Sequence, residues 1–168
     1  MKLIITAITT CFLCLFSLKA EPTSFFKVTV EHSLTLEQMA GLGHYNLPTD
    51  ELLKNFPKTS SRDEETVEVT LVHVNLFLVP VNVSTEYILD QMNRNGLRPA
   101  TIEELLTVGA EFPDLQRKYP VIALGSVRES CGLRYVACLS KDTSLRYLSL
   151  SQFDGVWGAD CRFLAVRK

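Results

Sequence analysis

Residues 66–79 read TVEVTLVHVNLFLV, and this run decides the fold prediction because it is the strongest β-strand pattern in the chain. Its alternation places Val67 and Val69 on one face, and its second half is apolar on both faces. Such a pattern is typical of a strand in the middle of a sheet. Pro80 ends the run, because proline cannot donate a backbone hydrogen bond to a neighbouring strand.

A strand and two short helices are predicted before this run. Residues 26–32 alternate between apolar and polar side chains, which indicates a strand. Thr35 and Gln38 have the spacing of a capping box, in which two side chains satisfy the free backbone N–H groups at a helix start. They predict a helix through Met39, and a second short helix follows at about residues 50–55.

The segments after the run predict two more helices and then strands only. Ser84 or Thr85 caps a helix over 86–93, and a clearer capping box, Thr101 with Glu104, opens a helix to about Ala110. Four strands follow, at residues 121–126, 133–139, 145–150 and 162–167. Because helices and strands do not alternate regularly, we expect an α+β fold. Its sheet is mostly antiparallel, its helices are short, and its C-terminal part is predominantly β.

The first twenty residues have the layout of a secretory signal peptide. A short basic start is followed by an apolar run over 3–18 and by the small Ala20, after which cleavage is expected. The run is shorter than the roughly 20 residues of a spanning helix, but a retained anchor is an alternative. A lipoprotein with Cys11 or Cys14 as the lipidated residue is another. We therefore expect a secreted or periplasmic protein without stable membrane insertion.

The remaining residues, 21–168, number 168 − 20 = 148, which fits a single α+β domain. If there are two subdomains, 21–95 and 96–168, the polar stretch 57–65 and the turn at Asn95-Gly96 are the candidate boundaries. The net charge of −2 becomes −4 once Lys2 and Lys19 are removed. A mildly acidic chain with scattered basic residues argues against nucleic acid as a partner.

A loop near the C-terminus is the candidate binding site. Asp154 and Asp160 flank Trp157, the only tryptophan, in a segment that contains Gly155 and Gly158. Exposed aromatic residues dominate contact energies, so this loop is a candidate surface for a protein or glycan ligand. The alternative is that the ring covers the core while the aspartates cap turns.

Three cysteines follow the signal, an odd number for an oxidising compartment. If a disulfide forms, we expect it between Cys138 and Cys161, because both lie at or beside strands of the C-terminal sheet. Cys131 lies next to Gly132 in an expected turn and remains as the free thiol. The competing prediction is three reduced, buried thiols.

No pattern in the sequence names a catalytic residue, a cofactor or a metal ligand set. The three histidines, His32, His44 and His73, show no metal-binding spacing, and no nucleophile elbow or phosphate-binding loop is present. We therefore expect a non-catalytic binding or structural module of the cell envelope or extracellular space. A secreted enzyme, most plausibly a hydrolase with unidentified catalytic residues, is the alternative.

Three segments carry a resemblance to known proteins. They are GLRPATIEELL at 96–106, ALGS at 123–126 and CRFLAVR at 161–167. Together they resemble a group of small exported bacterial proteins of unknown function, and this resemblance implies no activity.

A more distant resemblance links the C-terminal half to C-type-lectin-like modules of the formylglycine-generating-enzyme kind. Arg98, Thr101 and Glu104 match the helix start of those modules, and Phe163 loosely matches their last strand. Leu105 stands where the modules have tryptophan, and their calcium-binding middle is absent, so no catalytic residue carries over.

Overall fold

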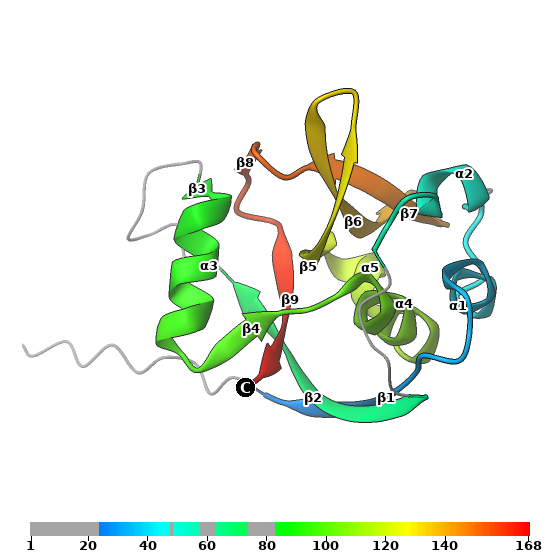
Figure 1. Cartoon of the computed structure of the whole chain (residues 1–168), viewed down its shortest axis with the longest axis horizontal. Coiled ribbons are helices and arrows are strands. Elements are labelled where there is room, and N and C mark those ends of the chain that lie inside the picture. Colours follow the sequence, from blue (N-terminus) through cyan, green and yellow to red (C-terminus); the bar gives the residue numbers. More distant parts are fainter. Residues whose placement is uncertain (1–23, 48, 58–62, 74–82) are drawn as a thin grey trace, which may run out of the picture.

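The computed structural model describes residues 24–47, 49–57, 63–73 and 83–168 (Figure 1). Within these residues the predicted α+β class is confirmed, with five helices and a mostly antiparallel mixed sheet. The strand order across the sheet is β1 (Phe26–Glu31), β2 (Glu64–His73), β9 (Arg162–Arg167), β5 (Val121–Ser130), β6 (Leu133–Asp142) and β7 (Leu145–Gln152). β4 (Leu97–Pro99) also pairs with β9, and β3 (Val83–Ser84) forms a separate two-stranded sheet with β8 (Val156–Trp157).

β9 is the strand that joins the sheet together. It pairs antiparallel with β2 along most of its length and with β4 near its end, while its first residues run parallel to β5. The β5–β9 pairing is the one parallel pairing among the described strands. Because β2 precedes Asn95-Gly96 and β9 follows it, the sheet runs across that candidate subdomain boundary.

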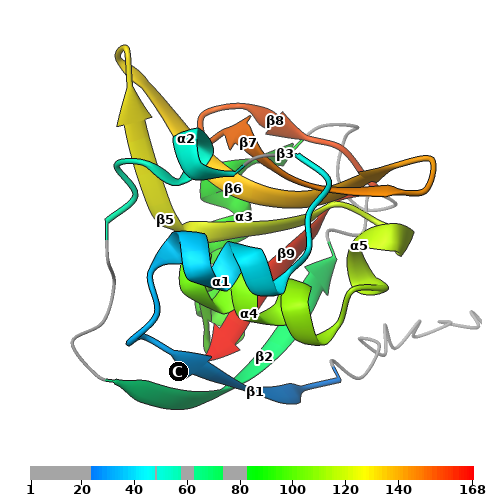
Figure 2. The same ribbon diagram turned by 90° about the vertical axis from the view of Figure 1, so that its right-hand side faces the viewer.

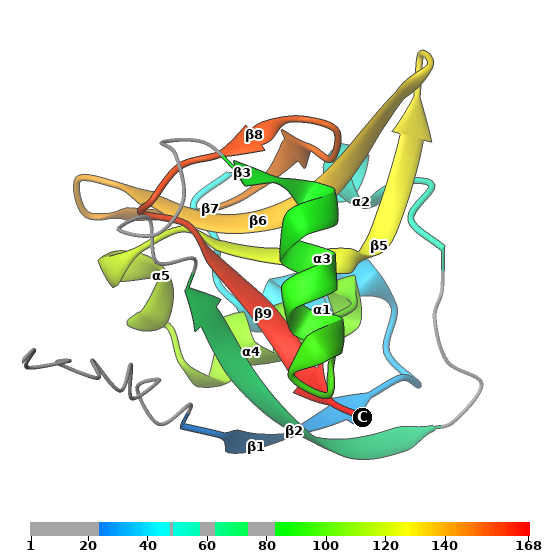
Figure 3. The same ribbon diagram turned by 90° about the vertical axis from the view of Figure 1, so that its left-hand side faces the viewer.

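Helices cover both faces of the sheet. α4 (Ile102–Glu111) packs with α1 (Leu36–Leu42) on one face, and α3 (Thr85–Arg94) lies against the other (Figures 2 and 3). The short α2 (Asp50–Leu53) and α5 (Leu115–Lys118) complete the set. Two cores result. The α4-side core includes Val28, Val69, Leu105, Leu139 and Leu164. The α3-side core includes Ile88, Met92, Ile122, Trp157 and Phe163.

The alternation of the 66–79 run is confirmed where the structure describes it. Val67 and Val69 belong to the α4-side core, as their shared face requires. Residues 74–79 of the run lie outside the described residues, as does the expected signal peptide at 1–20. In the described parts of the chain no helix is both long enough and apolar enough to cross a membrane.

The strand predicted at 133–139 is longer in the structure and runs to Asp142. Pairing between β6 and β7 continues to Asp142 and Leu145, so the turn is the two-residue Thr143-Ser144. β5 is also longer than predicted and reaches Ser130, which pairs with Leu133. Cys131 and Gly132 therefore form a two-residue hairpin loop with φ values of 52° and 75°. Positive φ at both positions is the geometry of a type I′ turn, whose twist matches that of the flanking strands.

A buried arginine fixes the C-terminal end of α4. The Arg146 guanidinium donates to the carbonyl oxygens of Gly43 (2.7 Å) and Gly109 (2.6 Å). It also donates to the side-chain oxygen of Gln116 and lies over the Tyr45 ring. A cation is favourable here because the last carbonyls of a helix carry partial negative charge. One side chain of β7 thus connects α1, α4 and α5 to the sheet.

Gly125 allows β5 to pass close to the segment that leads into α4. Its N–H donates to the carbonyl oxygen of Ala100 at 2.8 Å. A Cβ at position 125 would stand 2.6 Å from that oxygen and 2.8 Å from the Pro99 oxygen, both of them backbone atoms. A side chain at this position therefore requires the backbone itself to move.

Gly125→Ala should lower the free energy of unfolding by about 1–3 kcal/mol, because overpacking against backbone is relieved only by moving it. Gly41→Ala is the matched control, because Gly41 lies in α1 with open space around its Cβ position. Alanine there should stabilise the protein by about 0.5–1 kcal/mol. Urea unfolding measures both changes, and equal unfolding midpoints for the two variants would contradict the close approach.

Candidate functional site

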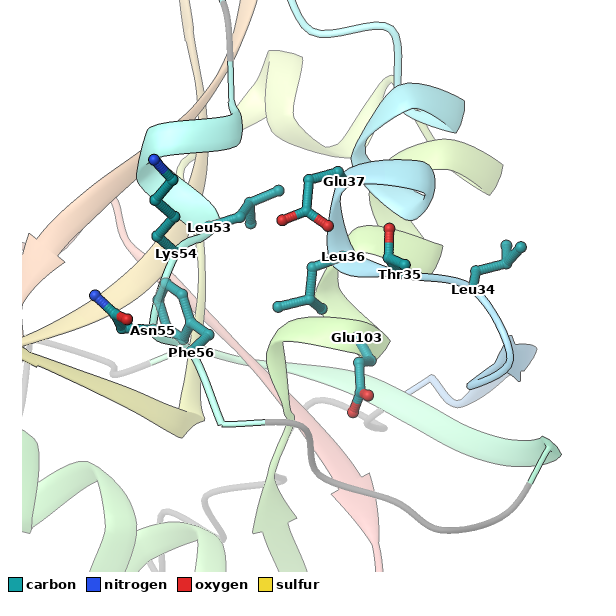
Figure 4. Close-up of a pocket in the computed structure, with 9 residues that line it drawn as sticks. All are labelled: Leu34, Thr35, Leu36, Glu37, Leu53, Lys54, Asn55, Phe56 and Glu103. Carbon is teal, nitrogen blue, oxygen red and sulfur yellow. The ribbon is translucent and has the colours of Figure 1, made fainter.

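A pocket of about 260 Å³ lies between α1, α2 and the first turn of α4 (Figure 4). Four apolar side chains line it: Leu34, Leu36, Leu53 and Phe56. Leu36 follows the Thr35 capping box directly, so the cap that starts α1 also places this side chain. The volume is just below the range of about 300–1,000 Å³ that is usual for ligand pockets, which limits an occupant to a small molecule.

The polar lining runs from an exposed mouth to a buried end. Glu37 and Lys54 are exposed, whereas Glu103 is only 2% exposed. In Figure 4 Glu103 lies on the far side of the pocket from Lys54, and its carboxylate points away from Leu36 and Lys54. The Lys54 ammonium forms an ion pair with Glu51, which is outside the lining. The pocket therefore borders Glu103 without opening onto its buried Oε2.

Glu103 is incompletely paired. Its Oε1 lies 3.5 Å from Nδ1 of His32, and its Oε2 is buried without a hydrogen-bond partner in the described structure. The His32 ring is also buried, and its Nε2 lies 3.8 Å from a carboxylate oxygen of Glu65. Neither ring nitrogen makes a hydrogen bond. Buried polar atoms without partners cost about 1–3 kcal/mol each, so their presence beside a pocket calls for an explanation.

The neighbouring carboxylate, Glu104, is fully engaged by contrast. Arg98 on β4 donates to its two oxygens at 2.7 and 3.0 Å, and the Thr101 N–H donates to Oε2 at 2.7 Å. The Thr101 hydroxyl in turn accepts from the Glu104 N–H, which confirms the predicted capping box. Hydrogen bonding to Glu104 raises the pKa of Arg98. Two adjacent buried carboxylates thus differ sharply in how they are paired.

The cluster around Glu103 is poorly arranged for catalysis or for metal binding. The two nitrogens of His32 face different carboxylates, and His32 is not part of the pocket lining. A general base needs a nitrogen within hydrogen-bond reach of the proton that it removes from a substrate. Among the residues that the structure describes, no group of three or more His, Cys, Asp or Glu side chains is arranged to hold a metal ion.

The predicted binding loop does not come together as one site. Trp157 is 6% exposed in the α3-side core, where its Nε1 donates to the Thr85 hydroxyl at 2.8 Å. Its ring also meets Phe163 edge-on at 5.4 Å. Asp154 and Asp160 are exposed, and Asp154 is paired with Arg134, which lowers the pKa of the Asp154 carboxyl. The tryptophan ring therefore covers the core, as the alternative prediction states.

The two cysteines of the predicted disulfide lie against the same core. Cys138 belongs to the α3-side core, and Cys161 is partly buried against it. In the structure Cys131, Cys138 and Cys161 are separate thiols.

A second group of residue types that occur in catalytic sites, a histidine, a cysteine and an aspartate, lies at the surface near His73. This histidine pairs across strands with Arg162, and its Nε2 lies 3.2 Å from the Ala159 carbonyl oxygen. The neighbouring Cys161 thiol points to the Asp160 carboxylate, and burial together with that charge raises its pKa. A raised pKa keeps the thiol protonated, which is the opposite of what a cysteine nucleophile needs.

Sequence reasoning missed Glu103 and His32 as site residues. Glu103 was not singled out in the sequence, and His32 was weighed only as one of three histidines without metal-binding spacing. The available signal was the position of Glu103 in the first turn of an apolar helix, because a carboxylate there is stabilised by the helix dipole even when buried. Nothing in the sequence brings α2 to that turn.

Comparison of the chain with protein-family models, curated proteins and solved structures finds no match in any of the three.

Cysteine accessibility tests this arrangement of the thiols. We expect alkylation of the folded protein to modify Cys131 readily and Cys138 at least roughly 100-fold more slowly, since the thiolate is the reactive form. Cys138 is buried, and burial raises its pKa to about 12, while Cys131 is exposed. Peptide mapping after unfolding without reductant should recover Cys138 and Cys161 as separate alkylated peptides. A linked Cys138–Cys161 peptide pair would contradict the three separate thiols of the structure.

Proposed function

We propose that this chain is an exported, non-catalytic binding module that takes a small molecule in the pocket between α1 and α2. The observation that carries the proposal is the pocket itself, a space of about 260 Å³ whose apolar lining of Leu34, Leu36, Leu53 and Phe56 is combined with charged groups at its mouth. Export rests on the N-terminal sequence alone.

The mixture of apolar and charged residues in the pocket lining supports small-molecule binding. Ligand pockets are typically apolar with a few placed polar groups that fix orientation. Here Leu36 and Phe56 supply apolar surface, while Glu37 and Lys54 supply charged groups at the mouth. The Trp157 loop offers less to a protein or glycan partner, because its aromatic ring is in the α3-side core and not at the surface.

The alternative function, a hydrolase, has weaker support. His32 has carboxylates at both ring nitrogens, and His73 lies beside a backbone carbonyl. The thiols of Cys138 and Cys161 both have raised pKa values, chiefly because of burial. Each of these arrangements disfavours the activated nucleophile on which covalent hydrolysis depends.

A bulky substitution in the pocket tests the proposal. Leu36→Trp should fill the space between α1 and Phe56, so small molecules that bind the wild-type protein should bind at least roughly tenfold more weakly. Leu42→Trp is the matched control, because it adds the same ring to the same helix at a position that is 58% exposed. A fragment screen by amide chemical-shift mapping provides the measurement.

The expected binders shift amide signals of α1, α2 and the first turn of α4 in the wild type and in Leu42→Trp. Binders that Leu36→Trp leaves unaffected, or a screen in which no fragment shifts these signals, would contradict a small-molecule site in this pocket.

A further inference from the structure

We infer that a second copy of this chain binds along the free edge of β1, so that two sheets join into one across a two-fold axis at Thr29. The two β1 strands pair antiparallel, and Lys27 of each copy lies opposite Glu31 of the other. The partner is a second copy because this edge is complementary to itself in charge. The surface is separate from the pocket, and the inference does not depend on what the pocket binds.

The two outer strands of the sheet, β1 and β7, differ in how their free edges are covered. They lie at opposite ends of the sheet, with β1 at the lower rim of the molecule in all three ribbon views (Figures 1, 2 and 3). On β7 the Arg146 carbonyl oxygen accepts from the Asn46 N–H at 2.9 Å, and the Arg146 N–H donates to Oδ1 of Asn46 at 2.7 Å. On β1 the described chain outside β2 supplies a single backbone hydrogen bond, from the Leu34 N–H to the Glu31 carbonyl oxygen. The edge of β1 is therefore the more open of the two.

The side chains of β1 are sorted between its two faces. Val28 and Val30 are 2% and 0% exposed in the α4-side core, whereas Lys27 and Glu31 on the other face are exposed. Directly opposed residues of two antiparallel strands lie on the same face of the sheet. With the two-fold axis at Thr29, lysine therefore meets glutamate on the outer face and valine meets valine on the inner face.

The positions of the charges select this register over its neighbours. An axis at Val28 would place Lys27 opposite a threonine, and an axis at Val30 would do the same for Glu31. An axis at Lys27 or at Glu31 would place that residue opposite its own copy. Opposite charges across a strand pair stabilise it, and like charges destabilise it. A lysine on an edge strand normally hinders pairing with another strand, and an axis at Thr29 removes that obstacle by supplying a carboxylate.

The charged groups of β1 are poorly neutralised within one chain. Glu31 lies directly opposite Glu64 on β2, and neither carboxylate forms an ion pair in the part of the chain that the structure describes. The Lys27 ammonium is 4.0 Å from Glu68, which Arg167 contacts at 2.8 Å, and the Lys27 side chain is 72% exposed. Lys27 is thus available to a second copy, where it would offset the repulsion between Glu31 and Glu64.

The experiment measures the monomer–dimer equilibrium by sedimentation velocity, from low micromolar to near millimolar protein at neutral pH and low salt. A short edge pairing buries less than a standard interface, so we expect a weak, reversible dimer. Its formation should shift the amide signals of residues 26–31 and leave those of β7 unchanged. A protein that stays monomeric throughout, or a dimer whose signals shift elsewhere and not in β1, would overturn the inference.

Reversal of one charge tests the register. Lys27→Glu alone and Glu31→Lys alone should each weaken dimerisation at least roughly tenfold, because each places like charges opposite each other at both symmetry-related pairs. Lys118→Glu is the matched control, since it makes the same change of charge at an exposed position on α5. It should leave the dimer unchanged. Dimers of undiminished affinity in both single variants would contradict the pairing of residues 27 and 31.

Exchange of the charges distinguishes lost pairing from a general loss of structure. The double variant Lys27→Glu/Glu31→Lys restores opposite charges in the same register and should dimerise as the wild type does. An equal mixture of the two single variants should form a heterodimer, because an acidic edge then meets a basic one. Failure of both combinations to recover dimerisation would overturn the inferred register.

The wild-type protein provides a test that does not depend on any variant folding. Because exposed charge pairs are screened by salt, raising the ionic strength from low salt to about 1 M should weaken the dimer. A dimer whose affinity is unchanged or greater at high salt would show that the lysine–glutamate pairs do not hold it together, and it would contradict the inference.

Discussion

The burial of the first turn of α4 is the constraint on which the rest of the structure depends. Two carboxylates, Glu103 and Glu104, are 2% and 3% exposed. Charges leave water only when hydrogen bonds and opposite charges replace their hydration. For Glu104 that replacement is complete, because Arg98 on β4 and the Thr101 N–H surround it. Since β4 pairs with β9, this ion pair ties the central strand of the sheet to the helix that packs on it.

The opposite end of α4 is held by a different kind of contact. Arg146 is a buried cation whose hydrogen-bond partners are the backbone carbonyls of Gly43 and Gly109 and the amide of Gln116. Burial lowers the pKa of this guanidinium, and the helix C-terminus offsets part of that cost. With both ends fixed, α4 gives α1 and α2 a rigid surface. The pocket lies where these two short helices meet the first turn of α4.

Local patterns in the sequence predicted most elements of this fold but few of its contacts. The capping boxes at Thr35 and Thr101 are confirmed, because both depend on residues only three positions apart. The strand predicted at 133–139 ends too early, since the polar residues Ser140, Lys141 and Asp142 resemble a loop although they remain paired with β7. The pocket could not be predicted, because it needs Phe56 and Glu103 from segments 47 residues apart. The burial of Trp157 likewise depends on Thr85, 72 residues away.

The central claim is that Glu104 serves stability while Glu103 is held at a cost to it. The most direct measurement is the free energy of unfolding of Glu104→Gln and Glu103→Gln, from urea titrations of the unliganded protein at neutral pH. Glu104→Gln should lose about 3–5 kcal/mol, because it leaves the Arg98 charge half-buried without its partner. Glu103→Gln should change stability by less than about 1 kcal/mol, since an amide needs less hydration than an underpaired carboxylate. A loss for Glu103→Gln as large as that for Glu104→Gln would contradict the account, because it would make Glu103 a structural ion-pair residue.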